Sequence, residues 1–161
     1  LEAAQQRGAE IYAEIVDYES NSDAYSIVQL KKSGASIKQL LEKLIQDKQI
    51  DYLNAHGTGT MLNDKVEADV IRQVFGSLQE QPLINSTKSI VGHSIGASGA
   101  LEAAVAAVAL KEQRVHQNLV EQPMSNLNLA LASQSVAIDY ALSTSYGFGG
   151  HNAGLVLKRW D

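Results

Sequence analysis

The chain has 161 residues, of which 45% are apolar and 19% charged, so it is expected to form one globular domain and not a disordered segment. Thirteen Lys and Arg against eighteen Asp and Glu give a net charge of -5, so there is no basic excess for binding nucleic-acid phosphates. Cysteine is absent, which excludes a disulfide framework, a thiolate metal site and a thiol nucleophile within these residues.

The N-terminal third is predicted to hold one strand and one helix. Apolar residues alternate with small or acidic ones over 11–16, as in a strand with one exposed face. Residues 17–26 have the composition of a loop. A helix is predicted from Ser36, as its N-cap, to residue 46, because apolar residues recur there at three-and-four spacing.

The next segment predicts a strand, a turn and a helix. Residues 51–56 form a short strand that leads into a glycine-rich turn. The following helix spans 63–75 and ends at Gly76. Asp64 and Glu67 lie three residues apart near its start, which is the spacing of an acidic capping box.

The remaining elements complete an α/β pattern. Residues 82–85 predict a buried strand, and the clearest helix spans 96–113. That helix is apolar on almost every side between Leu101 and Leu110, which predicts burial on all faces. Three strands follow, over 135–138, 140–145 and 153–158. Because helices and strands alternate, we expect a layered α/β fold with a largely buried sheet.

One histidine ends a predicted strand, and another lies in the segment that follows the next predicted strand. His56 opens the turn Gly57-Thr-Gly-Thr60, and ligands of α/β folds bind at the carboxyl ends of strands. The glycines permit close approach of a ligand, and the threonine hydroxyls can bind an amide. Alternatively, His56 is a structural histidine packed under the turn. Lys88 and His93 lie beside Gly92 and could bind an anion, although the segment lacks the phosphate-loop pattern; a surface lysine is the alternative.

Two further features have a functional and a structural interpretation. Glu102 lies in the apolar helix, where a buried carboxylate needs a cation, and Lys88 is the candidate. The alternative is a narrow exposed stripe that includes Ser98. Phe148 lies among three glycines in a turn whose N–H groups could face an anion. A tight hairpin loop is the alternative there.

Together, four segments resemble the C-terminal half of β-ketoacyl-acyl-carrier-protein synthases, the condensing enzymes of fatty-acid and polyketide synthesis. They are Asn54-Ala-His-Gly-Thr-Gly-Thr60, Asn63-Asp64 with Glu67-Ala68, Ser86-Thr-Lys-Ser-Ile-Val-Gly-His93-Ser-Ile-Gly-Ala-Ser-Gly99, and Tyr146-Gly-Phe-Gly-Gly-His-Asn-Ala153. Residues 7–15 and 22–25 resemble the segment that joins the two halves of the family fold. The resemblance therefore covers nearly the whole chain, and residues 1–161 are interpreted as one C-terminal ketosynthase domain excised from a longer chain.

The resemblance implies a thiolase-like α/β fold, with this chain as the C-terminal half of a five-layered αβαβα sandwich. It implies an acyltransferase that performs a decarboxylative Claisen condensation of an acyl thioester with malonyl-acyl carrier protein. The nucleophilic cysteine of the family lies in the other half, so this chain alone is expected to be inactive. Two alternatives are a homologue that only decarboxylates and a non-catalytic partner subunit that resembles a chain-length factor.

The resemblance also assigns roles to single residues. His56 and His93 match the two active-site histidines, Lys88 and Glu102 match the lysine and its acid, and Thr58 and Thr60 match the threonines that bind phosphopantetheine. Phe148 matches the gating aromatic residue, and its N–H matches an oxyanion-hole donor. Asp64 and Glu67 match acids that we interpret as structural. His151 replaces a threonine that is frequent in the family, and His116 is expected to be exposed.

Further expectations concern partners and location. The resemblance implies binding of an acyl carrier protein, which carries the phosphopantetheine, and no cofactor or metal of the enzyme's own. It also implies contact with the N-terminal half and a homodimer in the full-length protein. The longest apolar run has 8 residues, too short for a membrane span, and no secretion signal is recognised, so we expect a soluble cytoplasmic protein. The loop after Tyr25 is shorter than usual in the family, which leaves its substrate contacts open.

Overall fold

A mixed five-stranded sheet forms the centre of the computed structural model, which describes residues 1–160. β1, β7 and β6 pair antiparallel, whereas β6, β2 and β3 run parallel. In spatial order the strands are β1 (Ala13–Ser22), β7 (His151–Arg159), β6 (Tyr140–Gly147), β2 (Tyr52–Asn54) and β3 (Leu83–Asn85). Because the three parallel strands share a direction, their carboxyl ends meet at one edge of the sheet.

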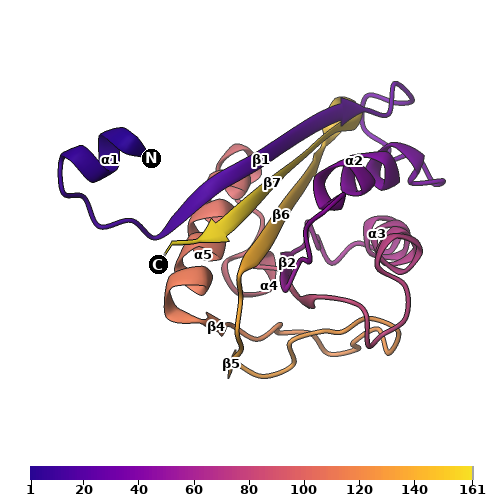
Figure 1. The fold of residues 1–161 in the computed structure, drawn as a ribbon. Helices are drawn as coiled ribbons and strands as arrows, with labels where there is room; N and C mark the ends of the chain where they lie inside the picture. The colour runs from indigo at the N-terminus through magenta and orange to yellow at the C-terminus, as the bar shows by residue number, and fades with distance from the viewer. Residues whose placement is uncertain (161) are drawn as a thin grey trace.

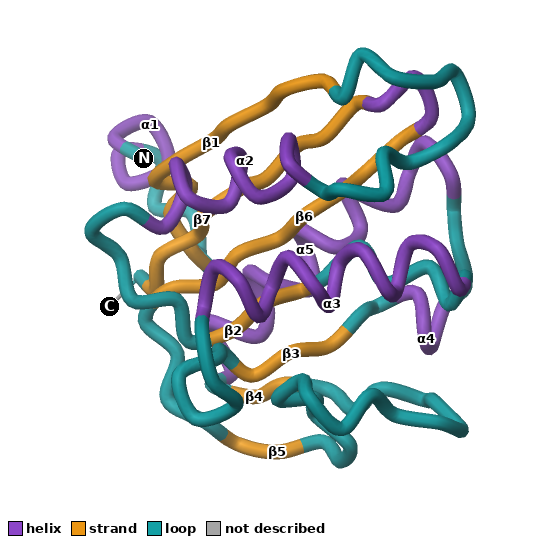
Figure 2. Tube along the Cα trace, turned by 90° about the vertical axis from the view of Figure 1, so that its right-hand side faces the viewer, coloured by secondary structure: helices purple, strands orange, loops and turns teal. Residues whose placement is uncertain are grey.

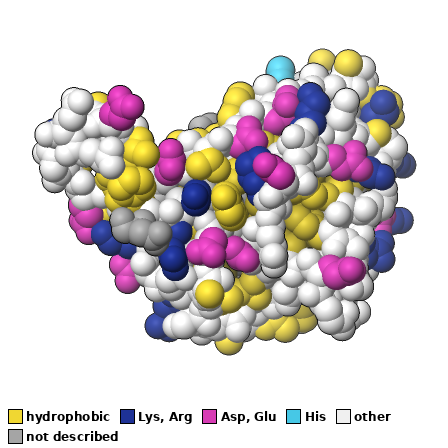
Figure 3. Space-filling model, viewed as in Figure 1, with side chains coloured by type: hydrophobic (Ala, Val, Ile, Leu, Met, Phe, Trp, Pro, Cys, Tyr) yellow, Lys and Arg dark blue, Asp and Glu magenta, His cyan; other side chains and the backbone are white. Residues whose placement is uncertain are grey.

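Helices cover both faces of this sheet. In Figure 2, α2 (Ala35–Ile45) and α3 (Met61–Phe75) lie in front of the strands, and α5 (Ser98–Glu112) lies behind them. The short α1 (Glu2–Gln6) stands off the rest of the molecule, and hydrophobic side chains reach the surface beside it (Figures 1 and 3). The small remaining elements are α4 (Lys88–Val91), η1 (Ile95–Ala97), β4 (Arg114–Val115), β5 (Gln134–Ser135) and η2 (Phe148–Gly150).

The core divides into two clusters because successive strand residues point to opposite faces of the sheet. Leu53 packs with the apolar faces of α2 and α3, whereas its neighbour Tyr52 packs with the buried face of α5. Leu142 and Ala141 of β6 divide in the same way. The predicted layered α/β arrangement is therefore confirmed.

Two predictions about the N-terminal third were wrong. Residues 17–22 do not form a loop but continue β1. β1 is an edge strand, so polar side chains can occupy its exposed positions. The N-cap of α2 is Gly34, not Ser36, and Gly34 adopts a left-handed φ of 60°. A Cβ atom at Gly34 would lie 2.5 Å from Val70 Cγ2, so the helix packing itself favours glycine there.

The long apolar helix is not buried on all faces in this chain. The side of α5 toward the sheet is buried, but Leu101 and Val108 are 39% and 45% exposed. Apolar residues of the preceding segment are exposed as well, namely Ile90, Val91 and Ile95. None of the helices over residues 1–160 is long and apolar enough to span a bilayer.

Candidate active site

The predicted site residues gather at the edge where the parallel strands end. His56 follows β2 by two residues, Lys88 follows β3 by three, and Phe148 directly follows β6. Glu102 enters from the first turns of α5, on the other side of the sheet from α3. Segments that are far apart in the sequence are thus brought together by the parallel pairing of β2 with both β3 and β6.

The backbone that carries His56 is held by a buried carboxylate. Glu67 of α3 accepts hydrogen bonds from the backbone N–H groups of His56 and Gly57, both at 2.8 Å. Burial raises the pKa of Glu67 to about 6, although these bonds and one from Asn63 act in the opposite direction. Gly57 has a φ of 41°, and a Cβ atom there would lie 2.5 Å from Ser86 Cβ. The turn therefore requires glycine and fixes the position of the imidazole.

The structural role of the acidic pair differs from a capping box. α3 begins after Thr60, and no side chain among the described residues caps its first turn by a hydrogen bond. Asp64 instead accepts a hydrogen bond from Gly59 N at 3.2 Å. Glu67 likewise accepts from the backbone of the turn, at His56 and Gly57. The capping prediction was wrong, because both carboxylates accept hydrogen bonds from backbone N–H groups of the preceding turn and not from the first turn of the helix.

The His56 ring is buried and uncharged. It is 6% exposed, and its Nδ1 lies 3.3 Å from the Lys88 ammonium. Burial lowers the pKa of His56 to about 3, with further contributions from the charges of Lys88 and His93. Because an ammonium can only donate, Nδ1 of this neutral ring accepts and Nε2 carries the proton. His56 Nε2 has no hydrogen-bond partner among residues 1–160.

Lys88 and Glu102 form a buried ion pair, as predicted. Their residues are 8% and 1% exposed, so the alternative of an exposed stripe at Glu102 and Ser98 was wrong. Ser145 donates a further hydrogen bond to the second Glu102 oxygen at 3.2 Å. A partner on each side satisfies the carboxylate, which is the condition for burying a charge.

The second histidine ring stands beside the first. The centroids of His56 and His93 lie 5.7 Å apart with the planes at 87°. Nδ1 of His93 accepts a hydrogen bond from Ile95 N at 3.1 Å and lies 3.0 Å from Ser98 Oγ. Unlike His56, His93 is exposed in this chain. Its Nε2 also has no hydrogen-bond partner within the described part of the chain.

Both rings line one cleft of about 770 Å³. Thr58 and Thr60 lie in its wall, with their hydroxyls 2.9 Å apart. Phe148 also lines it and is 77% exposed. Its loop is tied to the segment after β1 by hydrogen bonds from Gly149 N to Ile27 O and from Asp23 N to Gly150 O, both at 2.8 Å. The structure thus brings all seven predicted site residues to one region.

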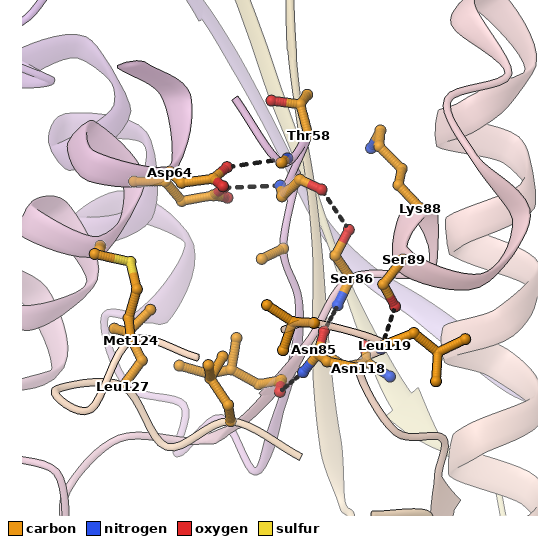
Figure 4. A pocket seen from close by; sticks show the side chains of 18 of the residues that line it. Thr58, Asp64, Asn85, Ser86, Lys88, Ser89, Asn118, Leu119, Met124 and Leu127 are labelled. Atoms are coloured by element: carbon orange, nitrogen blue, oxygen red, sulfur yellow. Dashed lines mark hydrogen bonds between the residues drawn. The ribbon is translucent and has the colours of Figure 1, made fainter. Parts of the chain in front are cut away.

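A second cavity of about 360 Å³ borders the turn after His56, because Gly57, Thr58 and Gly59 line it. Figure 4 shows it between Asp64, the apolar pair Met124 and Leu127, and the Ser86 backbone bonded to Asn118. Thr58 and His93 line both this cavity and the cleft, so the two share a wall, whereas Lys88 lines this cavity alone. The structure describes no group of three or more His, Cys, Asp or Glu side chains that could hold a metal ion within residues 1–160.

Sequence reasoning missed two side chains that contact the rings, and it misjudged the exposure of His116. Tyr146 packs its ring against His56 with the centroids 5.3 Å apart, and Ser98 contacts His93. His116 is half-buried, not exposed as expected, and its Nε2 lies 3.4 Å from Thr87 Oγ1. Two features of the sequence could have indicated these contacts. They are the motif that contains Tyr146 and the five-residue spacing from His93 to Ser98. His116 gave no such signal, because Thr87 is distant in the sequence.

A family model described as "Beta-ketoacyl synthase, C-terminal domain" matches residues 12–121. The 3-oxoacyl-[acyl-carrier-protein] synthase 2 of Staphylococcus aureus (strain COL) is 39% identical over 170 residues, which cover 100% of this chain and 41% of the relative. The 3-oxoacyl-[acyl-carrier-protein] synthase 1 of Buchnera aphidicola subsp. Acyrthosiphon pisum (strain APS) is 37% identical over 99% of this chain and 40% of its own length. The chain thus spans about two fifths of the curated relatives it matches.

Solved structures agree with these matches. A β-ketoacyl synthase from Burkholderia phymatum STM815 superposes with a TM-score of 0.87 and 31% identity, covering 100% of this chain and 41% of that protein. The complex AntDE:AntF, a type II PKS acyl-carrier protein with its ketosynthase, gives 0.89 and 30%, covering 99% and 41%. The thiolase-like fold expected from the sequence, with this chain as the C-terminal part, is confirmed by these neighbours.

Proposed function

The chain belongs to the β-ketoacyl synthase family as its C-terminal domain, and we propose that the protein containing it condenses an acyl thioester with malonyl-acyl carrier protein. The observation that carries this proposal is the pair of histidine rings on one cleft. In each ring Nδ1 is held by a donor, so Nε2 is free to donate to a substrate.

The chemistry requires stabilisation of one developing charge. When the malonyl group loses carbon dioxide, the electron pair of the broken C–C bond moves toward the thioester carbonyl. An enolate forms, and its oxygen carries the negative charge. Nε2–H groups of His56 and His93 donate to that oxygen. The enolate carbon then attacks the carbonyl of an acyl group bound to the cysteine thiol, the new C–C bond forms and the thiolate leaves.

Lys88 and Glu102 support this state without contacting the substrate. The ammonium donates to His56 Nδ1 and disfavours a second positive charge on that ring. Glu102 holds the ammonium in place within the buried pair. A neutral imidazole donor suits the reaction because it stabilises the oxyanion without transferring its proton before carbon dioxide leaves.

The nucleophile is proposed to lie in an N-terminal half, since this chain contains no cysteine. The exposed apolar side of α5 and the exposed His93 support contact with such a half. A homodimer of the full-length protein and a cytoplasmic location belong to the same proposal. The enzyme is proposed to use no cofactor other than the phosphopantetheine arm of its carrier protein.

Phe148 is proposed to act as a gate at the cleft. Its side chain is largely exposed on a loop that contains Gly149 and Gly150, both with positive φ. Such a loop can change conformation at low steric cost, and its backbone N–H is available for the acyl carbonyl in the oxyanion hole.

The threonine pair gives a prediction about the phosphopantetheine arm. Thr58→Val with Thr60→Val is expected to raise KM for malonyl-acyl carrier protein about tenfold and to leave kcat nearly unchanged, because the hydroxyls bind the arm equally in the ground and transition states. Steady-state release of carbon dioxide measures both constants. An S-ethyl malonyl thioester, which lacks the amide groups of the arm, serves as control. An equal loss with both substrates would refute the assignment.

The proposed function itself is tested with the complete protein, acyl-acyl carrier protein and malonyl-acyl carrier protein. The expected products are a β-ketoacyl-acyl carrier protein and one carbon dioxide per condensation, whereas residues 1–161 alone are expected to give neither. Release of carbon dioxide without condensation would identify a decarboxylase, and the absence of both reactions would favour a partner subunit. The presence of both histidines argues against the last outcome.

A further inference from the structure

We propose that Ser98 is a positioning residue for His93, a role that rests on the proposed condensation activity. Ser98 is the first residue of α5 and is 4% exposed. Its hydroxyl lies 3.0 Å from His93 Nδ1, and the residue lines the same cleft as the two rings. The contact lies on the side of the ring away from the Nε2 that would donate to the substrate.

The hydrogen bonds at Nδ1 determine the tautomer of His93. The backbone N–H of Ile95 can only donate, so at 3.1 Å it makes Nδ1 of the neutral ring an acceptor. The Ser98 hydroxyl then donates to the same nitrogen. With Nδ1 accepting from both groups, the ring proton lies on Nε2, the nitrogen that the reaction needs.

The Ser98 contact joins the His93 ring to a part of the fold that the Ile95 contact does not reach. His93 is exposed, Gly92 before it has a φ of 75°, and Ile95 after it has a φ of 49°. A hydrogen bond from Ile95 joins the ring only to this same short segment. Ser98 instead belongs to a helix of 15 residues that packs against the sheet. Its hydroxyl therefore fixes the ring to the core.

The position of Ser98 also links the two histidines. Ser98 and Glu102 are four residues apart, so they share one face of α5. Glu102 holds Lys88, which contacts His56, while Ser98 contacts His93 directly. One face of one helix thus orients both rings. This explains how two histidines from different loops can donate to the same enolate oxygen.

A purely structural role predicts a different outcome for Ser98. Its side chain makes no capping hydrogen bond at the N-terminus of α5 within residues 1–160. Alanine has a higher helix propensity than serine, so Ser98→Ala leaves the helix intact. The substitution therefore removes the contact with His93 and little else. Ser94→Ala is the matched control, because Ser94 is exposed and its hydroxyl makes no contact with the ring.

The first readout is the ¹⁵N NMR spectrum of the full-length protein labelled at histidine, with His93 assigned by its loss in His93→Gln. In Ser98→Ala we expect the Nδ1 resonance of His93 to move toward the value of a free acceptor nitrogen. We expect Ser94→Ala to leave it in place. An unchanged Nδ1 resonance in Ser98→Ala would overturn the proposal whether or not the protein is active.

The second readout is kinetic. Release of carbon dioxide from malonyl-acyl carrier protein is expected to fall about tenfold in kcat in Ser98→Ala, with KM and acylation of the nucleophile unchanged. An equal fall in acylation, or full activity, would contradict a positioning role. If the unsubstituted protein releases no carbon dioxide, the proposed function fails, while the NMR result still decides whether Ser98 positions the ring.

Discussion

Replacing His93 with alanine in the complete protein is expected to reduce release of carbon dioxide from malonyl-acyl carrier protein by about 100- to 1000-fold. The variant loses one of two Nε2–H donors to the enolate oxygen, and removing a single oxyanion donor typically has an effect of this size. Acylation of the nucleophile does not form this enolate, so it is expected to survive at least in part. His93 lies in the cleft wall beside the largely exposed Phe148 loop, so its truncation leaves no buried void.

The two steps can be measured separately. Carbon dioxide release is followed with labelled malonyl-acyl carrier protein, and acylation is followed as covalent transfer of the acyl group to the protein. The third histidine of the region, His116, provides the control, because its ring faces Thr87 and does not line the cleft. His116→Ala should retain carbon dioxide release to within a few-fold. Equal loss of both steps in His93→Ala would contradict the division of roles.

The second large effect is expected at the buried ion pair. Glu102→Gln removes the negative charge with little change in volume and leaves the Lys88 ammonium buried without its counter-charge. Breaking such a pair costs about 3–5 kcal/mol, so the free energy of unfolding should fall by that amount. Carbon dioxide release should also fall at least 100-fold, since Lys88 is no longer held in position beside His56. Urea unfolding and the decarboxylation assay measure the two effects.

Two further variants separate stability from activity. In Lys88→Met with Glu102→Leu, both charges are replaced by apolar groups, so stability should return to within about 1 kcal/mol of the unsubstituted protein while activity stays low. Glu42→Gln breaks the exposed pair with Lys38, in which the two atoms lie 3.7 Å apart, and should cost at most about 0.5 kcal/mol. A Glu102→Gln variant as stable as Glu42→Gln would show that the buried pair does not hold Lys88.

Local patterns predicted the elements that have a strong period or a clear boundary. The apolar spacing of α2 and Gly76 at the end of α3 gave those helices nearly to the residue. The predicted strand at β1 ended too early, because an edge strand exposes polar side chains and its sequence then resembles that of a loop. The exposure of α5 was missed because an all-apolar helix indicates burial against something, and the sequence does not say whether that partner is in the same chain.

The site was predicted where one residue implies another. A carboxylate in an apolar helix requires a cation, and this requirement predicted the pairing of Glu102 with Lys88. Residues that complete a contact across the fold carry no such signal. His116 contacts Thr87, which is 29 residues away, and the pairing of β2 with β6 brings Tyr146 to His56. Asp64 and Glu67 have the spacing of a capping box, but their oxygens accept hydrogen bonds from the loop before the helix.

The proposed reaction depends on an uncharged His56 ring whose Nε2 carries the proton. Histidine-selective NMR across a pH titration of the full-length protein measures this directly. The burial of the ring and the ammonium beside it lower the pKa of His56 to about 3, so its resonances should not titrate between pH 5 and 8 and should retain the Nε2–H pattern throughout. A His56 ring that takes up a proton near pH 6.5, or that carries its proton on Nδ1, would contradict the account.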